Sequence, residues 1–364
     1  MGLANYTYND LPPKKDFPMK NRWISRLLGM ALTSLAVAAG PAKADKPVEL
    51  TFSAWIPQTH VLVANFMKPW AKEVEQATEG RVKINFLTKA VTNPVGHLDA
   101  VRNGIVDLAF ISYSYYPGNF DLMKFAMLPF SGNSAESTSL AAWDIYSKYL
   151  HDAKEHRGIK LLGIYGHGPG SVYTTDKQVQ NIADFEGLKL RIGGGMQADL
   201  SKALKVNAVV KPASESYELL STGVVDGVLF PPESVASFRL DTVVKHATVF
   251  PGGLYADLHG IIMNPSAFDR LSEKDREILM SLSGEHIARL GGKAWGDADV
   301  AAMKILEEHK VQFHPASDEL IAAVKERTAS FEQAWLDAAK AKGIDGPAVL
   351  AEFRADLKQR ESAN

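Results

Sequence analysis

The chain has 364 residues, with 40 Lys and Arg against 42 Asp and Glu, 46% hydrophobic residues and no cysteine. This length suggests about two domains, and the globular composition excludes disordered and collagen-like classes. The lack of cysteine excludes disulfide bonds, thiolate zinc sites, iron–sulfur clusters and a cysteine nucleophile. A net charge of −2 argues against the broad positive surface that nucleic-acid binding requires.

Residues 1–44 differ in character from the rest of the chain. They carry a net charge of +4, which leaves −6 for the remainder. A basic segment precedes the apolar run Leu27–Gly40, and Ala42-Lys43-Ala44 then supplies small residues before a cleavage point. The pattern predicts a secretory signal peptide rather than a retained anchor, because a membrane span needs about 20 apolar residues. We expect a periplasmic protein starting near Asp45, with translation beginning at Met1 or Met19.

Two series of alternating strands and helices follow. Alternating or continuous apolar runs indicate strands, and apolar positions three and four apart indicate helices. The first series is strand Val48–Trp55, helix Val61–Thr78, strand Val82–Leu87, helix Gly96–Asn103 and strand Ile105–Ile111. After helix Ser134–His156 and strand Lys160–Tyr165, the second series is strand Leu188–Ile192, helix Gln197–Leu204, strand Val206–Lys211, helix Ser214–Ser221 and strand Gly227–Phe230. Each series implies a largely parallel sheet.

The remaining elements complete an α/β fold with two lobes and a cleft between them. They are strands Val243–Phe250 and His259–Asn264, a helical stretch from Ser272 to about Lys310, strand Val311–His314, and helices Ser317–Lys342 and Pro347–Arg360. The long helical stretch has a weak point at Gly291-Gly292 and could span both lobes. We assign 45–170 with about 251–290 to lobe I, 171–250 with about 291–320 to lobe II, and 321–364 to C-terminal helices.

Catalytic and cofactor motifs are missing from the sequence. Gly166–Ser171 (GHGPGS) only superficially resembles a dinucleotide loop, because Ser171 replaces the third glycine and a strand follows. The chain contains no G-x-S-x-G, H-E-x-x-H or P-loop motif, and its histidines lack metal-ligand spacing. We therefore predict no catalytic residue, no cofactor and no metal site, and expect a protein that is not an enzyme.

One segment favours anion binding. In Asp184–Gly195 (DFEGLKLRIGGG), Arg191 ends a predicted strand, and a glycine loop leads into the helix that contains Gln197. A guanidinium fork beside the free N–H groups of a helix start suits a carboxylate. The alternative is a surface arginine at a strand end.

Several short sequence motifs resemble those of the periplasmic solute-binding subunit of tripartite ATP-independent periplasmic (TRAP) transporters, the DctP-like family. They are Asp99–Asp107 (DAVRNGIVD), Leu128–Phe130 (LPF), Asp184–Arg191 (DFEGLKLR), Pro212–Leu220 (PASESYELL) and Ser221–Gly227 (STGVVDG). The resemblance implies the two-lobed periplasmic binding protein fold, which closes on a small organic anion. It also implies that Arg191, at the family's strand-end arginine position, clamps the ligand carboxylate.

Departures from the sialic-acid binders of that family narrow the expected ligand. Val172 stands where they have a second arginine, Phe230 replaces a ligand-binding asparagine, and Ser112 falls near their acidic residue. This pocket would leave the hydroxyls of a nine-carbon sugar unpaired. With Trp55, Tyr113 and His167 as further candidates, we expect an aromatic or hydroxylated monocarboxylate; a uronate or aldonate is the alternative.

By the same resemblance, the partners are the small and large permease subunits in the membrane, and the protein is a monomer. No nucleic-acid partner is expected. Two other functions stay open, a chemosensory binding protein and a periplasmic enzyme.

Overall fold

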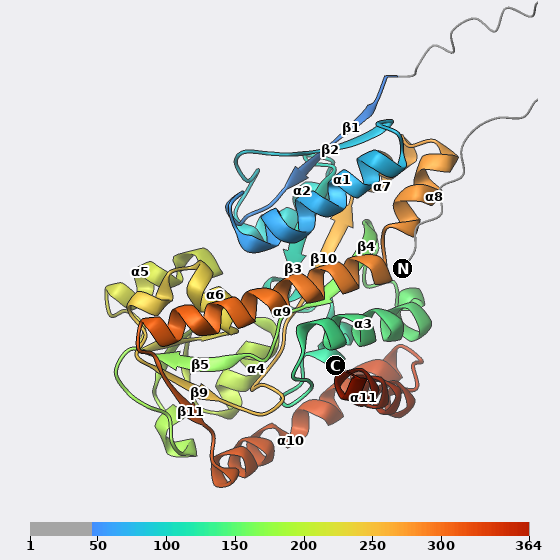
Figure 1. Cartoon of the computed structure of the whole chain (residues 1–364). Coiled ribbons are helices and arrows are strands. Elements are labelled where there is room, and N and C mark those ends of the chain that lie inside the picture. The colour runs from blue at the N-terminus through green and yellow to red at the C-terminus, as the bar shows by residue number, and fades with distance from the viewer. Residues whose placement is uncertain (1–45, 364) are drawn as a thin grey trace, which may run out of the picture. The chain divides into compact units, whose positions relative to one another are not determined.

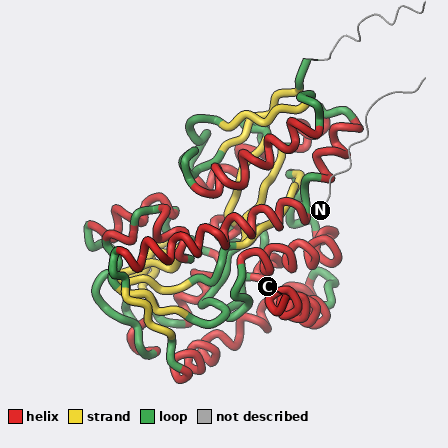
Figure 2. The backbone as a smooth tube through the Cα atoms, in the orientation of Figure 1, coloured by secondary structure: helices red, strands yellow, loops and turns green. Residues whose placement is uncertain are grey.

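The computed structural model describes residues 46–363, so the predicted signal peptide lies outside the described residues. The described residues belong to one compact unit. Within 46–363, none of the helices is long and apolar enough to cross a lipid bilayer. The strands fall into two separate sheets, seen as the two groups of yellow segments in Figure 2.

The first sheet has the strand order β2-β1-β3-β10-β4. Its strands are β1 (Val48–Ser53), β2 (Val82–Phe86), β3 (Leu108–Ser112), β4 (Lys160–Gly166) and β10 (Leu258–Met263). β10 is antiparallel to both β3 and β4, and the β1 pairings with β2 and β3 are parallel, so four of the five strands run in one direction. β3 and β10 are buried along their whole length, as expected for central strands covered on both faces.

The second sheet has the order β11-β9-β5-β8-β6-β7. Its strands are β5 (Ser171–Thr174), β6 (Lys189–Ile192), β7 (Asn207–Val210), β8 (Gly227–Phe230), β9 (His246–Val249) and β11 (Gln312–Pro315). Here β5 is the reversed strand, antiparallel to β8 and β9, while the other pairings are parallel. The chain enters this sheet after β4 and returns to the first sheet at β10. The prediction of two mostly parallel α/β lobes is confirmed.

Helices cover both sheets (Figure 1). The α-helices are α1 (Lys68–Ala77), α2 (His97–Arg102), α3 (Ala135–Ile145), α4 (Gly195–Ala203), α5 (Ser216–Ser221), α6 (Pro232–Ser237), α7 (Pro265–Asp269), α8 (Glu273–Ser281), α9 (Glu285–Glu308), α10 (Asp318–Ala341) and α11 (Gly346–Ala363). Shorter turns include the π-helices η1 (Val63–Met67) and η5 (Tyr146–Leu150) and the 3₁₀-helices η3 (Tyr113–Tyr115), η4 (Asp121–Ala126) and η7 (Ile182–Phe185). The sequence did not predict α6 and α7, which are short and begin with a proline.

The long helix α9 contacts β4 of the first sheet and α3 next to it, and it also contacts α6 beside the second sheet. Figure 1 shows it running past both sheets. The predicted weak point at Gly291-Gly292 is wrong: the helical stretch breaks at 282–284, where Gly284 has a φ of +63°. Gly291 and Gly292 lie within α9, and glycine is needed at both positions because the neighbouring residues leave no room for a Cβ. A Cβ at Gly291 would lie 2.7 Å from the Tyr165 ring, and one at Gly292 would lie 2.6 Å from Ser139 Oγ.

The C-terminal helices tie the two halves together from another side. Trp335 of α10 donates a 2.8 Å hydrogen bond to the Leu122 carbonyl in η4, the turn that follows β3 and η3 of the first lobe in the chain. Arg327 of the same helix lies 3.4 Å from Glu186, next to η7 and the second sheet.

The start of β3 differs from the prediction, because Ile105 is 66% exposed and the strand begins only at Leu108.

Candidate functional site

A pocket lies between the two sheets, with about 520 Å³ not filled by protein atoms, including the part open to solvent. This is within the range of small-molecule sites. Strand ends of both sheets line it. In the first sheet, Trp55 follows β1 and Ser112 is the last residue of β3; in the second sheet, Arg191 comes from β6 and Phe230 from β8. Turns, α6 and the long helix α9 complete the wall. The crevice at the ends of largely parallel strands is the usual ligand position in α/β folds.

Arg191 is the central charge of the pocket and is only 1% exposed. Strand alternation explains its position, because its neighbours Leu190 and Ile192 point into the core and Arg191 faces the other way. Its Nε donates a 2.8 Å hydrogen bond to the Lys211 carbonyl, and its guanidinium lies 4.6 Å from the centre of the Phe230 ring. Burial lowers the pKa of Arg191.

No carboxylate within residues 46–363 lies within 4.0 Å of the Arg191 guanidinium. A buried cation without a carboxylate in direct contact is costly, and an anion bound against it offsets that cost. The geometry therefore suits a ligand carboxylate, as the sequence predicts for this residue.

The glycine loop after β6 brings the second sheet against the first. Gly194 has a φ of +123°, and a Cβ there would lie 2.7 Å from the Ser114 carbonyl oxygen. Gly195, with a φ of +51°, begins α4, and a Cβ there would lie 3.0 Å from Ser114 Cα. The side chain of Gln197 accepts a 2.6 Å hydrogen bond from the Gly193 N–H and lines the pocket. Glycine is required here because this approach leaves no space for a side chain.

Tyr115 connects the two sheets at the charged side of the pocket. It comes from η3, just after β3, and its hydroxyl accepts a 3.0 Å hydrogen bond from the Ala213 N–H. The same hydroxyl lies 3.5 Å from Arg191 Nη2. Nearby, the Asp257 carboxylate accepts hydrogen bonds from the Ser112 hydroxyl (2.6 Å) and the Leu258 N–H (2.9 Å), and burial raises the pKa of Asp257 to about 6.

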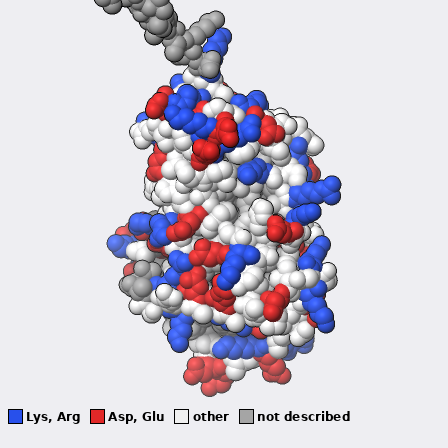
Figure 3. Space-filling view, turned by 90° about the vertical axis from the view of Figure 1, so that its right-hand side faces the viewer, with Lys and Arg blue, Asp and Glu red and all other residues white. Residues whose placement is uncertain are grey.

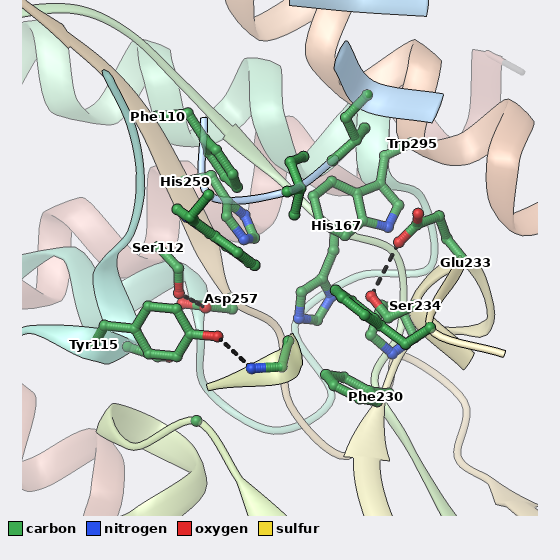
Figure 4. A pocket seen from close by; sticks show the side chains of 18 of the residues that line it. Phe110, Ser112, Tyr115, His167, Phe230, Glu233, Ser234, Asp257, His259 and Trp295 are labelled. Atoms are coloured by element: carbon green, nitrogen blue, oxygen red, sulfur yellow. Dashed lines mark hydrogen bonds between the residues drawn. The ribbon is translucent and has the colours of Figure 1, made fainter. Parts of the chain in front are cut away.

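Aromatic rings form the remaining walls. The Trp55 ring stacks on Phe110 at 4.9 Å, and Phe230 lies parallel to Phe238 at 6.0 Å. These rings come from both sheets and leave a slot that suits a flat apolar group. Figure 4 shows Phe110 and Phe230 on opposite walls.

A second polar group lies across the pocket from Tyr115 and Asp257 (Figure 4). Glu233, at the start of α6, accepts a 2.9 Å hydrogen bond from the Ser234 hydroxyl, and its carboxylate lies 3.3 Å from His60 Nε2. Burial lowers the pKa of His60. Behind it, Asp299 of α9 accepts a 2.8 Å hydrogen bond from the Glu233 N–H, and burial raises the pKa of Asp299 to about 8. The His60–Glu233 pair joins the loop after β1 to the helix after β8.

Six of the eight residues predicted for the site line the pocket: Arg191, Phe230, Trp55, His167, Gln197 and Ser112. Tyr113 and Val172 do not. Tyr113 points away because η3 has about three residues per turn, so Tyr113 and Tyr116 share a side and Tyr115 takes the pocket side. The Tyr113 hydroxyl pairs with His156 Nε2 at 2.8 Å instead. Val172 of β5 lies in the core, paired with Leu229.

The sequence prediction missed several lining residues: His60, Phe110, Tyr115, Glu233, Asp257, His259 and Trp295. Some carried a usable signal. Tyr115 lies two residues from the predicted Tyr113, and Glu233 follows the Pro231-Pro232 pair that comes directly after β8. Asp257, His259 and Trp295 carried none, since they reach the pocket through the reversed strand β10 and the long helix α9. Within 46–363, no cluster of three or more His, Asp or Glu residues could hold a metal ion.

Known proteins share this fold and sequence. Residues 52–337 match the family described as bacterial extracellular solute-binding protein, family 7 (DctP). The crystal structure of a TRAP periplasmic solute-binding protein from Bordetella bronchiseptica, with bound (R)- and (S)-mandelate, is 60% identical, covers 86% of this chain and 99% of its own, and has a TM-score of 0.84.

Two further relatives are more distant. A marine metagenome TRAP solute-binding protein specific for aromatic acid ligands, in complex with 3-hydroxybenzoate, is 27% identical over 86% of this chain and 99% of its own, with a TM-score of 0.79. The outer membrane transporter protein TsaT of Comamonas testosteroni is 27% identical over 89% of this chain and 96% of its own. Together, the match over residues 52–337 and the 60% identity show that the chain belongs to the DctP family of TRAP transporter solute-binding proteins.

Proposed function

We propose that this protein captures an aromatic monocarboxylate in the periplasm and delivers it to the small and large permease subunits of a TRAP transporter. Residues 1–44 would direct export and be removed, and the mature protein would act as a monomer. The observation that carries the ligand assignment is the buried Arg191 guanidinium, which has no carboxylate partner among residues 46–363 and lies on Phe230 in an aromatic pocket.

Charge supports a local mode of capture. Outside residues 1–44 the chain carries −6, and acidic and basic side chains are interspersed on the face seen in Figure 3. A broad positive field would steer anions from a distance, whereas here Arg191 acts once the anion is inside the pocket. Exclusion of water strengthens that pairing, because the effective dielectric falls.

Contacts across the pocket support a closing motion. The Tyr115 hydrogen bond to Ala213 and the His60–Glu233 pair join elements of the two sheets. A ligand that touches both sheets stabilises the closed form over the open one, which shifts a hinge equilibrium. We propose that the lobes move about the crossing segments near residues 170 and 250, with α9 spanning both.

Two relatives support an aromatic ligand, since one holds mandelate and the other holds 3-hydroxybenzoate. Isothermal titration calorimetry of the mature protein tests the assignment with benzoate, phenylacetate, benzyl alcohol, succinate and D-galacturonate. We expect the aromatic acids to bind and the uncharged alcohol to fail, because it offers Arg191 no charge. Tighter binding of galacturonate than of any aromatic acid would replace the aromatic assignment with the sugar-acid alternative. Turnover of a bound acid would instead indicate an enzyme.

A further inference from the structure

One corner of the pocket contains buried polar atoms that the protein leaves without a partner. The Trp295 Nε1 and the His259 Nδ1 are both buried and have no hydrogen-bond partner, and their residues are 4% and 5% exposed. Their rings lie 4.8 Å apart, and His167 lies 5.7 Å from Trp295. In Figure 4 these three side chains border the same space. An unpaired buried polar group is costly, so such a cluster points to a ligand atom that pairs with it.

The hydrogen-bonding roles of this corner follow from its chemistry. Trp295 Nε1–H can only donate. The Nδ1 of His167 faces the Gly168 carbonyl, which can only accept, so Nδ1 carries the proton and Nε2 is left as an acceptor. Burial lowers the pKa of His167 to about 4 and that of His259 well below its usual range, so both imidazoles are neutral at pH 7. The corner thus offers both a donor and an acceptor but no charge.

A hydroxyl group matches this arrangement because it donates one hydrogen bond and accepts others. A second carboxylate does not match. It has no hydrogen to donate to His167 Nε2, and this corner of the pocket contains no cation to neutralise its charge. A keto oxygen accepts from Trp295 but also leaves His167 Nε2 unpaired.

We propose that His167, His259 and Trp295 form a hydroxyl-binding subsite that makes the protein select hydroxylated aromatic acids over their unsubstituted and oxo counterparts. This inference rests on the proposed function, in which Arg191 holds the carboxylate. The three residues come from the crossing segment after β4, from β10 and from α9. A ligand hydroxyl would therefore connect elements of the hinge region to the anion held by the second sheet.

Calorimetry with a matched set of phenyl acids tests the subsite on the unmodified protein. Mandelate carries the hydroxyl at carbon 2, 3-hydroxyphenylacetate carries it on the ring, and phenylacetate lacks it. O-methylmandelate and 3-methoxyphenylacetate place an oxygen at the same two positions that can accept but not donate, and benzoylformate has a keto group. We expect at least one hydroxylated acid to bind about 10-fold more tightly than phenylacetate, with the methoxy and keto acids no tighter than phenylacetate. The hydroxylated acid that binds more tightly than phenylacetate identifies the ligand position at which the subsite binds a hydroxyl group.

Trp295→Phe sharpens the test because it removes the N–H and keeps the aromatic ring. The ratio of the affinity for the hydroxylated acid to the affinity for phenylacetate should fall several-fold, whatever change the smaller ring makes to phenylacetate binding itself. Trp335→Phe is the matched control, since its Nε1 bonds to Leu122 in η4, outside the pocket. Equal binding of phenylacetate and both hydroxylated acids would overturn the subsite and leave the proposed function standing. If no aromatic acid binds, the proposed function itself fails.

Discussion

The two sheets contribute different chemistry to the same pocket. The second sheet supplies the cation Arg191 and the ring beneath it, Phe230. The first sheet supplies Trp55 and Phe110, together with His259, whose buried ring is neutral. Neither sheet alone offers a complete site for an aromatic acid, because the charge and most of the apolar walls lie on opposite sides. On the proposed function, ligand affinity and closure are therefore coupled, and the predictions below test groups on both sides of the pocket and on the helix between them.

The largest effect should come from removing the charge of the second sheet. Arg191→Met keeps an apolar side chain against Phe230 but leaves the ligand carboxylate buried without a partner. We expect at least a 100-fold loss of affinity, or about 3 kcal/mol, in calorimetry. Arg191→Lys should also lose more than about 10-fold, because an ammonium cannot form the bidentate pair. Arg354→Met, which removes an exposed arginine paired with Glu332, is the control. Unchanged affinity in Arg191→Met would rule out the carboxylate clamp.

The next effect concerns stability where α9 meets α6. Burial raises the pKa of Asp299 from 3.8 to about 8, so the folded protein binds one more proton than the unfolded chain between these values. Stability should therefore fall as pH rises through that window, by an amount on the order of a few kcal/mol. Asp299→Asn should remove this slope in urea denaturation between pH 4 and 8. Asp297→Asn, at an exposed position on the same helix, should keep it. A slope shared by all three proteins would show that Asp299 is not its source.

A smaller effect should follow from keeping the two sheets apart. Gly194→Ala places a Cβ 2.7 Å from the Ser114 carbonyl oxygen. The loop must move away from η3, so we expect about 10-fold weaker binding and a stability loss of about 1–3 kcal/mol. Gly223→Ala is a matched control, because Gly223 also has a positive φ (+70°) but open space around it. If both variants bind equally well, the close approach at Ser114 does not contribute to closure.

The smallest predicted effect is a pH dependence of binding. Burial raises the pKa of Asp257 to about 6, and its carboxylate lines the pocket that receives the anion. Lowering the pH from 7.5 to 5 neutralises Asp257 and removes a repulsive charge, so affinity should rise several-fold. Asp257→Asn should bind at pH 7.5 about as tightly as the unmodified protein does at pH 5. An unaltered pH profile in that variant would assign the dependence to another group.

The sequence predicted what local patterns determine. Apolar alternation located most strands, and Arg191 stood out because a strand-end arginine precedes three glycines. The choice between Tyr113 and Tyr115 could not be predicted, since it depends on the three-residue turn of η3 rather than on strand alternation. Asp257, His259 and Trp295 could not be found either, because they meet the rest of the pocket only through the pairing of β10 with β3 and the packing of α9. The spacing of residues along the chain does not indicate long-range pairing of this kind.

Trp55 and Trp295 both line the pocket, and the chain has six tryptophans in all. An indole emits at a wavelength that depends on the polarity and hydrogen bonding around it. An aromatic acid that enters the pocket changes the polarity around both indoles, and a hydroxylated acid also supplies a partner for the Trp295 Nε1–H. The protein thus carries its own optical reporter, and the intrinsic fluorescence of the unlabelled chain should titrate with ligand. Trp295→Phe and Trp55→Phe would divide that signal between the long helix and the first sheet.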